Sequence, residues 1–183
     1  EAQIVKELGK FLMDESLYKG AKPVLWSVVE KTALADAEVE YKDHTSNTIY
    51  ASFKIKKTEK DFLKDGHIII WTTTPWTIPA NRALAYDSKI KYSVIKIGKD
   101  TKYFKNKKII VATELIKMIS EECNFKDFTV MKEFNGNDFK NTVCQHPLLN
   151  LGYGYDVPML EGDFVTLEQG TGVVHAAPSH GPD

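Results

Sequence analysis

The spacing of apolar residues predicts a short helix at the start of the chain. Four apolar residues recur at helical intervals in this part: Ile4, Leu8, Phe11 and Leu12. Gly20 follows them, and glycine commonly ends a helix. We therefore interpret residues 1–22 as an N-terminal connector helix and residues 23–183 as one globular domain.

Later segments alternate apolar and polar residues, which is typical of strands with one buried face. The continuous apolar run at residues 68–71 predicts a fully buried strand, and Pro75 ends it because proline has no backbone donor. A helix is predicted at residues 113–123. Further strands are predicted at 49–57, 91–97, 108–112, 127–134 and 163–168, and within 170–183.

Many short strands, few helices and no regular β-α-β alternation favour a mixed α/β (α+β) fold. We expect a closed or strongly curved, barrel-like sheet with short flanking helices.

The 183 residues are 43% hydrophobic and 27% charged, which is typical of one globular domain that folds in water. No apolar run is long enough to cross a membrane, and no signal peptide is recognisable, so we expect a cytoplasmic protein. Cys123 and Cys144 form no metal-binding pair and are expected to be reduced structural thiols.

The charge of the chain argues against tight binding to a long nucleic-acid duplex. The formal net charge is -1, whereas affinity for phosphates comes mainly from lysine and arginine. The lysines nevertheless form two runs: Lys54, Lys56, Lys57, Lys60 and Lys64, and Lys99, Lys102, Lys105, Lys107 and Lys108. Each run is either a solvated edge or turn of the sheet, or a local contact with RNA.

The segment from Trp71 to Asn81, WTTTPWTIPAN, carries the strongest chemical signal. Three threonines at the exit of a buried strand bring hydroxyls and unpaired backbone N–H groups into a small volume. Such a cluster can hold a water molecule beside a carbonyl oxygen. Threonine is also common in strands for its β-branched shape, and composition alone favours that simpler interpretation.

A second segment, GTGVVHAAPSHGPD at residues 170–183, places His175 after two valines. A histidine in such a strand is more often a hydrogen-bonded core residue than a functional one. The glycines lack the full dinucleotide or P-loop pattern, and no acidic residue completes a zinc site with His175 and His180. Ser179 has no evident base and no Gly-x-Ser-x-Gly elbow, so a serine triad is poorly supported.

Together, the two segments resemble the inserted editing domain of isoleucyl-tRNA synthetases. The flanks KPVLWSVVEKTALADAEVEY and QHPLL are also similar, so the resemblance covers nearly the whole chain. Valine- and leucine-specific relatives carry different residues at the positions of Thr74, Trp76 and His175. The resemblance implies the editing-domain fold of the class I Val, Ile and Leu enzymes. Their ATP-binding signatures are missing from this sequence, so we do not expect it to activate amino acids.

The resemblance implies a hydrolase that removes valine from wrongly charged isoleucine tRNA, and possible action on valyl-adenylate. An apolar synthetic site rejects a substrate lacking one methylene only weakly, so a second site must destroy the smaller product. The implied partners are the acceptor 3′ end of tRNA(Ile), valine as the rejected amino acid, and the remainder of the synthetase in cis. No membrane, metal or cofactor is expected for editing, because ATP would serve only the aminoacylation core.

The same resemblance assigns roles to individual residues. Thr72, Thr73 and Thr74 would hold the ester, the terminal ribose and the attacking water, while His175 would block the extra methylene of isoleucine. The substrate-binding set comprises Trp71, Trp76, Thr77, Asn81 and Ala177. Trp76 and Thr77 would shape the adenosine side of the site, although Trp76 is equally well interpreted as a core residue.

Asp183 marks the one departure from the family pattern. In the family, two acidic residues follow at this point, and the second anchors the α-ammonium group of the substrate. The sequence ends at Asp183, which matches the first. Either the second belongs to a longer protein, or the chain lacks its anchor for the ammonium group and binds the substrate but acts slowly, with Asp183 as an imperfect substitute. Two other functions stay open: a noncatalytic module that docks the aminoacylated RNA end, and an editing domain of a valyl-tRNA synthetase.

Overall fold

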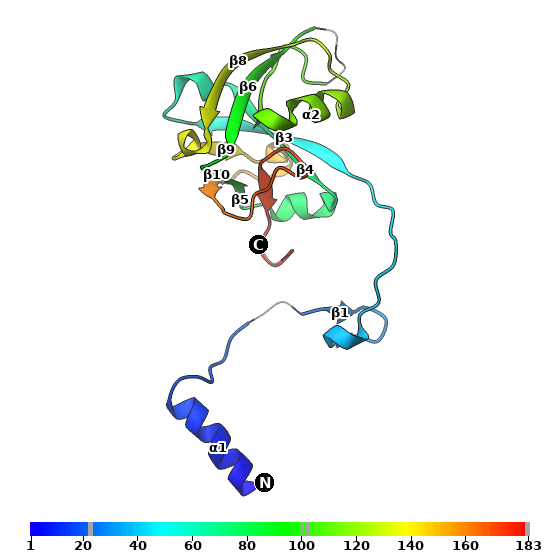
Figure 1. Cartoon of the computed structure of the whole chain (residues 1–183), viewed down its shortest axis with the longest axis vertical. Helices are drawn as coiled ribbons and strands as arrows, with labels where there is room; N and C mark the ends of the chain where they lie inside the picture. The colour runs from blue at the N-terminus through cyan, green and yellow to red at the C-terminus, as the bar shows by residue number, and fades with distance from the viewer. Residues whose placement is uncertain (22–23, 100, 102, 182–183) are drawn as a thin grey trace. The chain divides into compact units, whose positions relative to one another are not determined.

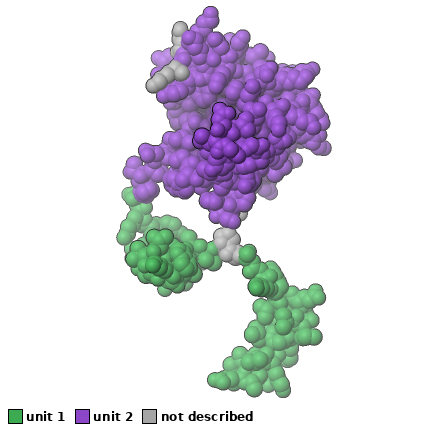
Figure 2. All heavy atoms as spheres, turned by 180° about the vertical axis from the view of Figure 1, so that it is seen from behind, with its two compact units in different colours: residues 1–43 green, residues 44–183 purple. Residues whose placement is uncertain are grey.

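The computed structural model describes residues 1–21, 24–99, 101 and 103–181. The chain divides into two compact units, residues 1–43 and residues 44–183 (Figure 2). This division falls later than the boundary at residue 22 that the sequence pattern suggests. The interpretation of residues 23–183 as one domain stays a prediction.

The first unit consists of small, solvent-exposed elements (Figure 1). Helix α1 spans Ala2–Met13, inside the predicted connector, and none of its residues is buried. Strands β1 (Trp26–Ser27) and β2 (Thr32–Ala33) form an antiparallel hairpin, followed by the 3-10 turn η1 (Asp36–Glu38). No described residue of this unit is buried, so it has no apolar core of its own.

The second unit is built on a nine-stranded mixed sheet in the order β11-β5-β10-β9-β3-β4-β7-β6-β8. β10 with β5 and β4 with β7 are parallel pairs, and the other neighbours are antiparallel. The strands are β3 (Ile49–Lys57), β4 (Gly66–Thr72), β5 (Ala83–Tyr86), β6 (Lys91–Ile97), β7 (Lys108–Ala112), β8 (Phe128–Asn135), β9 (Val143–Gln145), β10 (Asp156–Glu161) and β11 (Val174–Ala176).

The sheet curves strongly. Strand β11 stands at one end of the strand order, yet it also contacts β4, which four other strands separate from it. Among the described residues, the hydrogen-bonded order still has two ends, β11 and β8, so the sheet is not a closed barrel. The predicted mixed α+β fold with a curved sheet is confirmed, and closure of the sheet is not observed.

The core fills the inside of this curve. Central apolar positions of β4, β6 and β7 are fully buried, among them Ile68, Ile95 and Ile110. Helix α2 (Ile116–Glu122), preceded by the turn η4 (Thr113–Leu115), packs Ile119 into the same core. The remaining 3-10 turns are η2 (Asp61–Leu63), η3 (Pro75–Ala80), η5 (Gly136–Phe139) and η6 (Leu149–Leu151).

Most strand predictions are confirmed, but the one at residues 163–168 is wrong. That segment is irregular and crosses the surface between β10 and β11. Gly162 directly precedes this segment, and its backbone N–H donates to the carbonyl of Tyr86, after which pairing with β5 stops. The apolar alternation here therefore reflects the burial of individual side chains such as Val165, and not hydrogen bonding to a neighbouring strand.

Both cysteines are free thiols, and burial raises the pKa of Cys123 to about 11 and that of Cys144 to about 12. Such thiols are poor nucleophiles at neutral pH. In the part of the chain that the structure describes, no helix has the length and apolarity needed to cross a bilayer.

Candidate functional site

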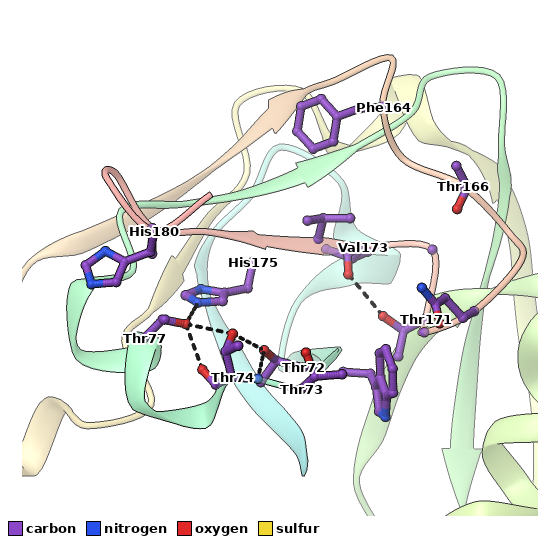
Figure 3. Close-up of a pocket in the computed structure, with 16 residues that line it drawn as sticks. Thr72, Thr73, Thr74, Thr77, Phe164, Thr166, Thr171, Val173, His175 and His180 are labelled. Carbon is purple, nitrogen blue, oxygen red and sulfur yellow. Dashed lines mark hydrogen bonds between the residues drawn. The ribbon is translucent and has the colours of Figure 1, made fainter. Parts of the chain in front are cut away.

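The two chemically informative segments meet at one cavity of about 350 Å³ (Figure 3). Strand β4 and the turn after it provide the threonine side, and β11 with the preceding loop provides the other. The cavity is lined by Trp71, Thr72, Thr73, Thr74, Thr77, Phe164, Thr166, Gln169, Gly170, Thr171, Gly172, Val173, Val174, His175, Ala177 and His180.

A change in backbone geometry brings the threonine hydroxyls together. β4 ends at Thr72, and η3 begins at Pro75, whose fixed φ suits the first position of a helical turn. Thr72 Oγ1 accepts a hydrogen bond from the backbone N–H of Thr74 at 3.1 Å and lies 3.2 Å from Thr74 Oγ1. Thr77, one turn later, donates its hydroxyl to the carbonyl oxygen of Thr74 at 2.8 Å.

His175 joins this cluster from the other side of the cavity. Its Nε2 lies 2.8 Å from Thr77 Oγ1, and its Nδ1 lies 2.8 Å from Asn81 Nδ2 (Figure 3 shows the first contact). Asn81 Nδ2 also donates to the carbonyl of Ala83 at 2.9 Å, which fixes the orientation of the amide. The Nδ1 atom of His175 must then accept the hydrogen bond from Asn81. The proton of the neutral ring is therefore on Nε2, which donates it to Thr77.

These contacts hold His175 as a neutral, immobile ring. Burial lowers its pKa, and the nearby His146 and His180 lower it further. Both ring nitrogens already have partners, so the ring has no free lone pair with which to take a proton from water. The arrangement fits a side chain that shapes the cavity.

The turn that carries Thr77 is itself supported from behind by two side chains. His146, which is 1% exposed, approaches the Ile78 carbonyl with Nε2 at 2.9 Å, and its Nδ1 accepts from the N–H of Leu148. Nε2 is therefore the donor. Tyr155 donates its hydroxyl to the next carbonyl, that of Pro79, at 3.1 Å. Two consecutive carbonyls of η3 are thus held by side chains distant in sequence.

The loop opposite the threonines is fixed by close packing around Gly172. The φ of Gly172 is +75°, and a Cβ there would lie 2.4 Å from the Cβ of Ala112. The backbone N–H of Ala112 donates to the carbonyl of Thr171, and the buried hydroxyl of Tyr92 donates to the carbonyl of Gly172. The Gly-x-Gly pair therefore serves a tight turn against β7.

The structure places the predicted site residues in three groups. Seven line the cavity: Trp71, Thr72, Thr73, Thr74, Thr77, His175 and Ala177. Asn81 is fully buried behind His175 and touches the ring without lining the cavity. Trp76 is 67% exposed and is not among the lining residues, so the interpretation of Trp76 as a core residue is wrong. Asp183 lies outside the described residues.

Several lining residues were not identified from the sequence. Phe164 and Thr166 belong to the irregular segment that the apolar pattern wrongly assigns to a strand. Thr171 and Val173 precede His175 in the glycine-containing segment, and Thr171 donates its hydroxyl to the carbonyl of Val173 at 3.2 Å. Their closeness to His175 in sequence is the one signal that could have drawn attention to them. Within the described residues, no three His, Cys, Asp or Glu side chains gather as a metal site requires.

Comparison with known proteins assigns the family. The model of the family "tRNA synthetases class I (I, L, M and V)" matches residues 1–147. The chain belongs to the class I tRNA synthetases. Among this family, an isoleucine–tRNA ligase of Pelagibacter ubique is 62% identical over 183 residues, and one of Gluconobacter oxydans is 49% identical over 188 residues. Each alignment covers 100% of this chain and 20% of the relative. The predicted homology to isoleucyl-tRNA synthetases is confirmed, and the chain spans about a fifth of the length of these ligases.

Solved structures agree with this synthetase assignment at the level of the fold. The crystal structure of GlLeuRS-CP1 has a TM-score of 0.56 and 14% identity, covering 71% of this chain and 54% of that one. The editing domain of the P. knowlesi cytosolic leucyl-tRNA synthetase has a TM-score of 0.55 and 10% identity, covering 70% and 55%. The predicted editing-domain fold is therefore confirmed.

Proposed function

We propose that the chain is an editing hydrolase that releases valine from wrongly charged valyl-tRNA(Ile). The observation that carries the proposal is a cavity of about 350 Å³ in which threonine hydroxyls face a neutral, fixed imidazole. Homology to isoleucine–tRNA ligases over the whole chain supports the choice of tRNA. Valyl-adenylate is a second substrate of the same chemistry.

The fixed ring of His175 provides the selectivity in this proposal. A side chain held at both nitrogens cannot turn aside for a larger ligand without breaking two hydrogen bonds. Valine is smaller than isoleucine by one methylene, so a rigid wall admits the first and clashes with the second. A steric clash excludes the larger amino acid, whereas an apolar pocket that only attracts its ligand does not reject a smaller one.

The threonines would serve the bond-breaking step. Water attacks the carbonyl carbon of the ester, the bond to the ribose oxygen breaks, and the products are valine and tRNA with a free ribose hydroxyl. The hydroxyls of Thr72, Thr73 and Thr74 would orient the water and donate to the oxygen on which negative charge develops. The reaction as proposed needs no metal or cofactor, and ATP would be used only by an aminoacylation core elsewhere in a synthetase.

The proposed partners follow from the same assignment. They are the acceptor 3′ end of tRNA(Ile) and, in cis, the remainder of a cytoplasmic synthetase. The exposed apolar residues of α1 support the second of these partners, the remainder of the synthetase. Ile4, Leu8 and Phe11 are 72%, 54% and 56% exposed and offer a surface for other parts of such an enzyme. An acidic group near Asp183 would bind the substrate ammonium.

A deacylation assay on the purified chain tests the proposal. We expect valine release from preformed valyl-tRNA(Ile), with little release of isoleucine from isoleucyl-tRNA(Ile). Thr72→Ala should slow the reaction, whereas Thr129→Ala, on the distant strand β8, should leave it unchanged. Binding of valyl-tRNA(Ile) without hydrolysis would instead indicate a docking module. Cleavage of threonyl-tRNA(Val) in its place would indicate a valine-type editing domain.

A further inference from the structure

A basic groove lies on the outer face of the sheet, away from the threonine cavity. It consists of Lys54 on β3, His67 on β4, Lys96 on β6, Lys107 just before β7, and Lys108 at the start of β7. These residues line one hollow of about 390 Å³ together with Asp65, Asn106 and Met131. Lys54 comes from the first lysine run of the sequence, and Lys107 and Lys108 come from the second. The fold therefore brings members of the two runs together.

The positive charge in the basic groove is only partly neutralised. Lys108 Nζ donates to the backbone carbonyls of Phe62 and Lys64, which fixes its position. In the described part of the chain, no ion pair or side-chain hydrogen bond involves the ammonium groups of Lys54, Lys96 or Lys107. Asp65 is the one carboxylate among the residues that line this hollow.

The strand register sets two of these lysines against each other. Lys96 and Lys108 are directly paired across β6 and β7, and like charges at such positions destabilise a sheet. His67 pairs with Lys54 across β3 and β4, and its pKa is lowered by burial and then by Lys107 and Lys54. Charges arranged in this way repel each other until an anion binds between them.

Neighbouring hollows extend the basic groove in two directions. Lys107 also lines a larger hollow of about 820 Å³, whose walls include Tyr50, Tyr103 and Phe104. One carboxylate, Glu122, also lines this hollow and accepts a hydrogen bond from the Tyr50 hydroxyl. Lys54, His67 and Lys107 line a third hollow that continues toward Gln145 and Asn150. A track of lysines beside aromatic rings is typical of surfaces that bind single-stranded nucleic acid, because phosphates meet the lysines and bases stack on the rings.

We propose that the basic groove binds the sugar–phosphate backbone of RNA next to its single-stranded 3′ end. The identification of that RNA as tRNA rests on the proposed function, whereas the inference that the groove binds RNA rests on its own charges and shape. Strand β4 connects the two sites: His67 stands near its start and Thr72 at its end, about 17 Å apart at the usual rise of a strand. A few nucleotides of RNA cover that distance.

The experiment measures RNA binding by the full 183-residue chain without any catalytic step. The probe is a fluorescently labelled RNA hairpin with a single-stranded 3′-CCA end, titrated at several salt concentrations. The test variant carries Lys54→Ala, Lys96→Ala and Lys107→Ala. The control carries Lys91→Ala, Lys132→Ala and Lys140→Ala, which removes the same charge from exposed positions outside the groove.

We expect the test variant to bind about tenfold more weakly or worse, with the slope of log K against log salt reduced by about 2. The control should bind as the unaltered chain does, and neither variant should melt earlier than it. Unchanged affinity and slope in the test variant would overturn the proposal, as would an equal loss in the control. The outcome does not depend on editing: weakened binding in the test variant would support the groove even if valyl-tRNA(Ile) were not hydrolysed.

Discussion

At the scale of single residues, the contacts of His175 determine what this side chain can do. Asn81 donates to one ring nitrogen and Thr77 accepts from the other, so the ring is neutral and cannot rotate freely. Thr77 passes the chain of hydrogen bonds on to the carbonyl of Thr74. Because the hydroxyl cluster and the imidazole share this chain, the position of the ring is set relative to the threonines.

Replacing His175 tests whether it selects the amino acid. His175→Ala removes the side chain that we expect to clash with isoleucine, so isoleucyl-tRNA(Ile) should be hydrolysed at a rate within about tenfold of the valyl-tRNA(Ile) rate. The measurement compares kcat/KM for the two aminoacyl-tRNAs. His180→Ala is the matched control, because His180 also lines the cavity but its ring contacts the carbonyl of its near neighbour Pro178 and not the threonine cluster. A variant that melts earlier but keeps the discrimination of the unaltered chain would make His175 a purely structural residue.

At the scale of elements, the turn η3 connects the site to the rest of the fold. It carries Thr77, and Asn81 follows it directly. His146, from the segment after β9, holds the carbonyl of Ile78, and Tyr155, just before β10, holds the carbonyl of Pro79. The rings of His146 and Tyr155 lie 5.1 Å apart, and Arg82 lies over the Tyr155 ring at 4.1 Å. If the site edits as proposed, its selectivity depends on side chains outside the cavity.

Tyr155→Phe tests this support with little change in packing. The ring and its contact with Arg82 remain, while the hydrogen bond to Pro79 is lost, which costs about 1 kcal/mol of stability. We expect kcat for valyl-tRNA(Ile) to fall several-fold, KM to change little, and hydrolysis of isoleucyl-tRNA(Ile) to rise.

Tyr153→Phe is the matched control for that variant. Tyr153 stacks on the same His146 ring at 5.0 Å, and none of the hydrogen bonds among described residues uses its hydroxyl. It should leave both rates unchanged. If Tyr155→Phe lowers the melting temperature but leaves the ratio of valyl to isoleucyl hydrolysis unchanged, then η3 does not transmit support to the site.

At the scale of the whole molecule, three partly or fully buried histidines couple folding to pH. Burial is the main cause of a lowered pKa for His67, His146 and His175, from an ordinary value of 6.5. As the pH falls below 6.5, the unfolded chain takes up protons on these residues before the folded chain does. The stability is therefore greatest above this value and decreases from about 6.5 downward, until the folded histidines also titrate.

Urea unfolding at about pH 7.5 and about pH 5.5 measures this effect. We expect a lower free energy of unfolding at about pH 5.5. His146→Gln should reduce the difference between the two values, because it removes the most buried of the three histidines. His44→Gln, at an exposed position that contributes to none of these three pKa shifts, should leave the difference as it is. Equal stability at both pH values would contradict the linkage.

The sequence alone predicts local elements wherever one pattern dominates. The apolar run at 68–71 and the alternation at 49–57 became β4 and β3, because burial of one or both faces specifies a strand without reference to its partners. The same reasoning fails at 163–168, where Phe164 and Val165 are separately placed by the cavity and the core and no partner strand is available. The two motifs could be identified as a site through family resemblance, since their residue types alone also fit a structural role.

Only the tertiary structure decided which of the motif residues act together. The curvature of the sheet brings β11 beside β4, and this contact places His175 against Thr77, 98 positions away in the chain. The packing of the domain also leaves Trp76 exposed, buries Asn81 behind the ring, and brings lysines from two separate runs into one groove. Periodicity along a chain records which face of an element is buried. The partners that meet across the core depend on strand order and curvature, which arise from the packing of the whole domain.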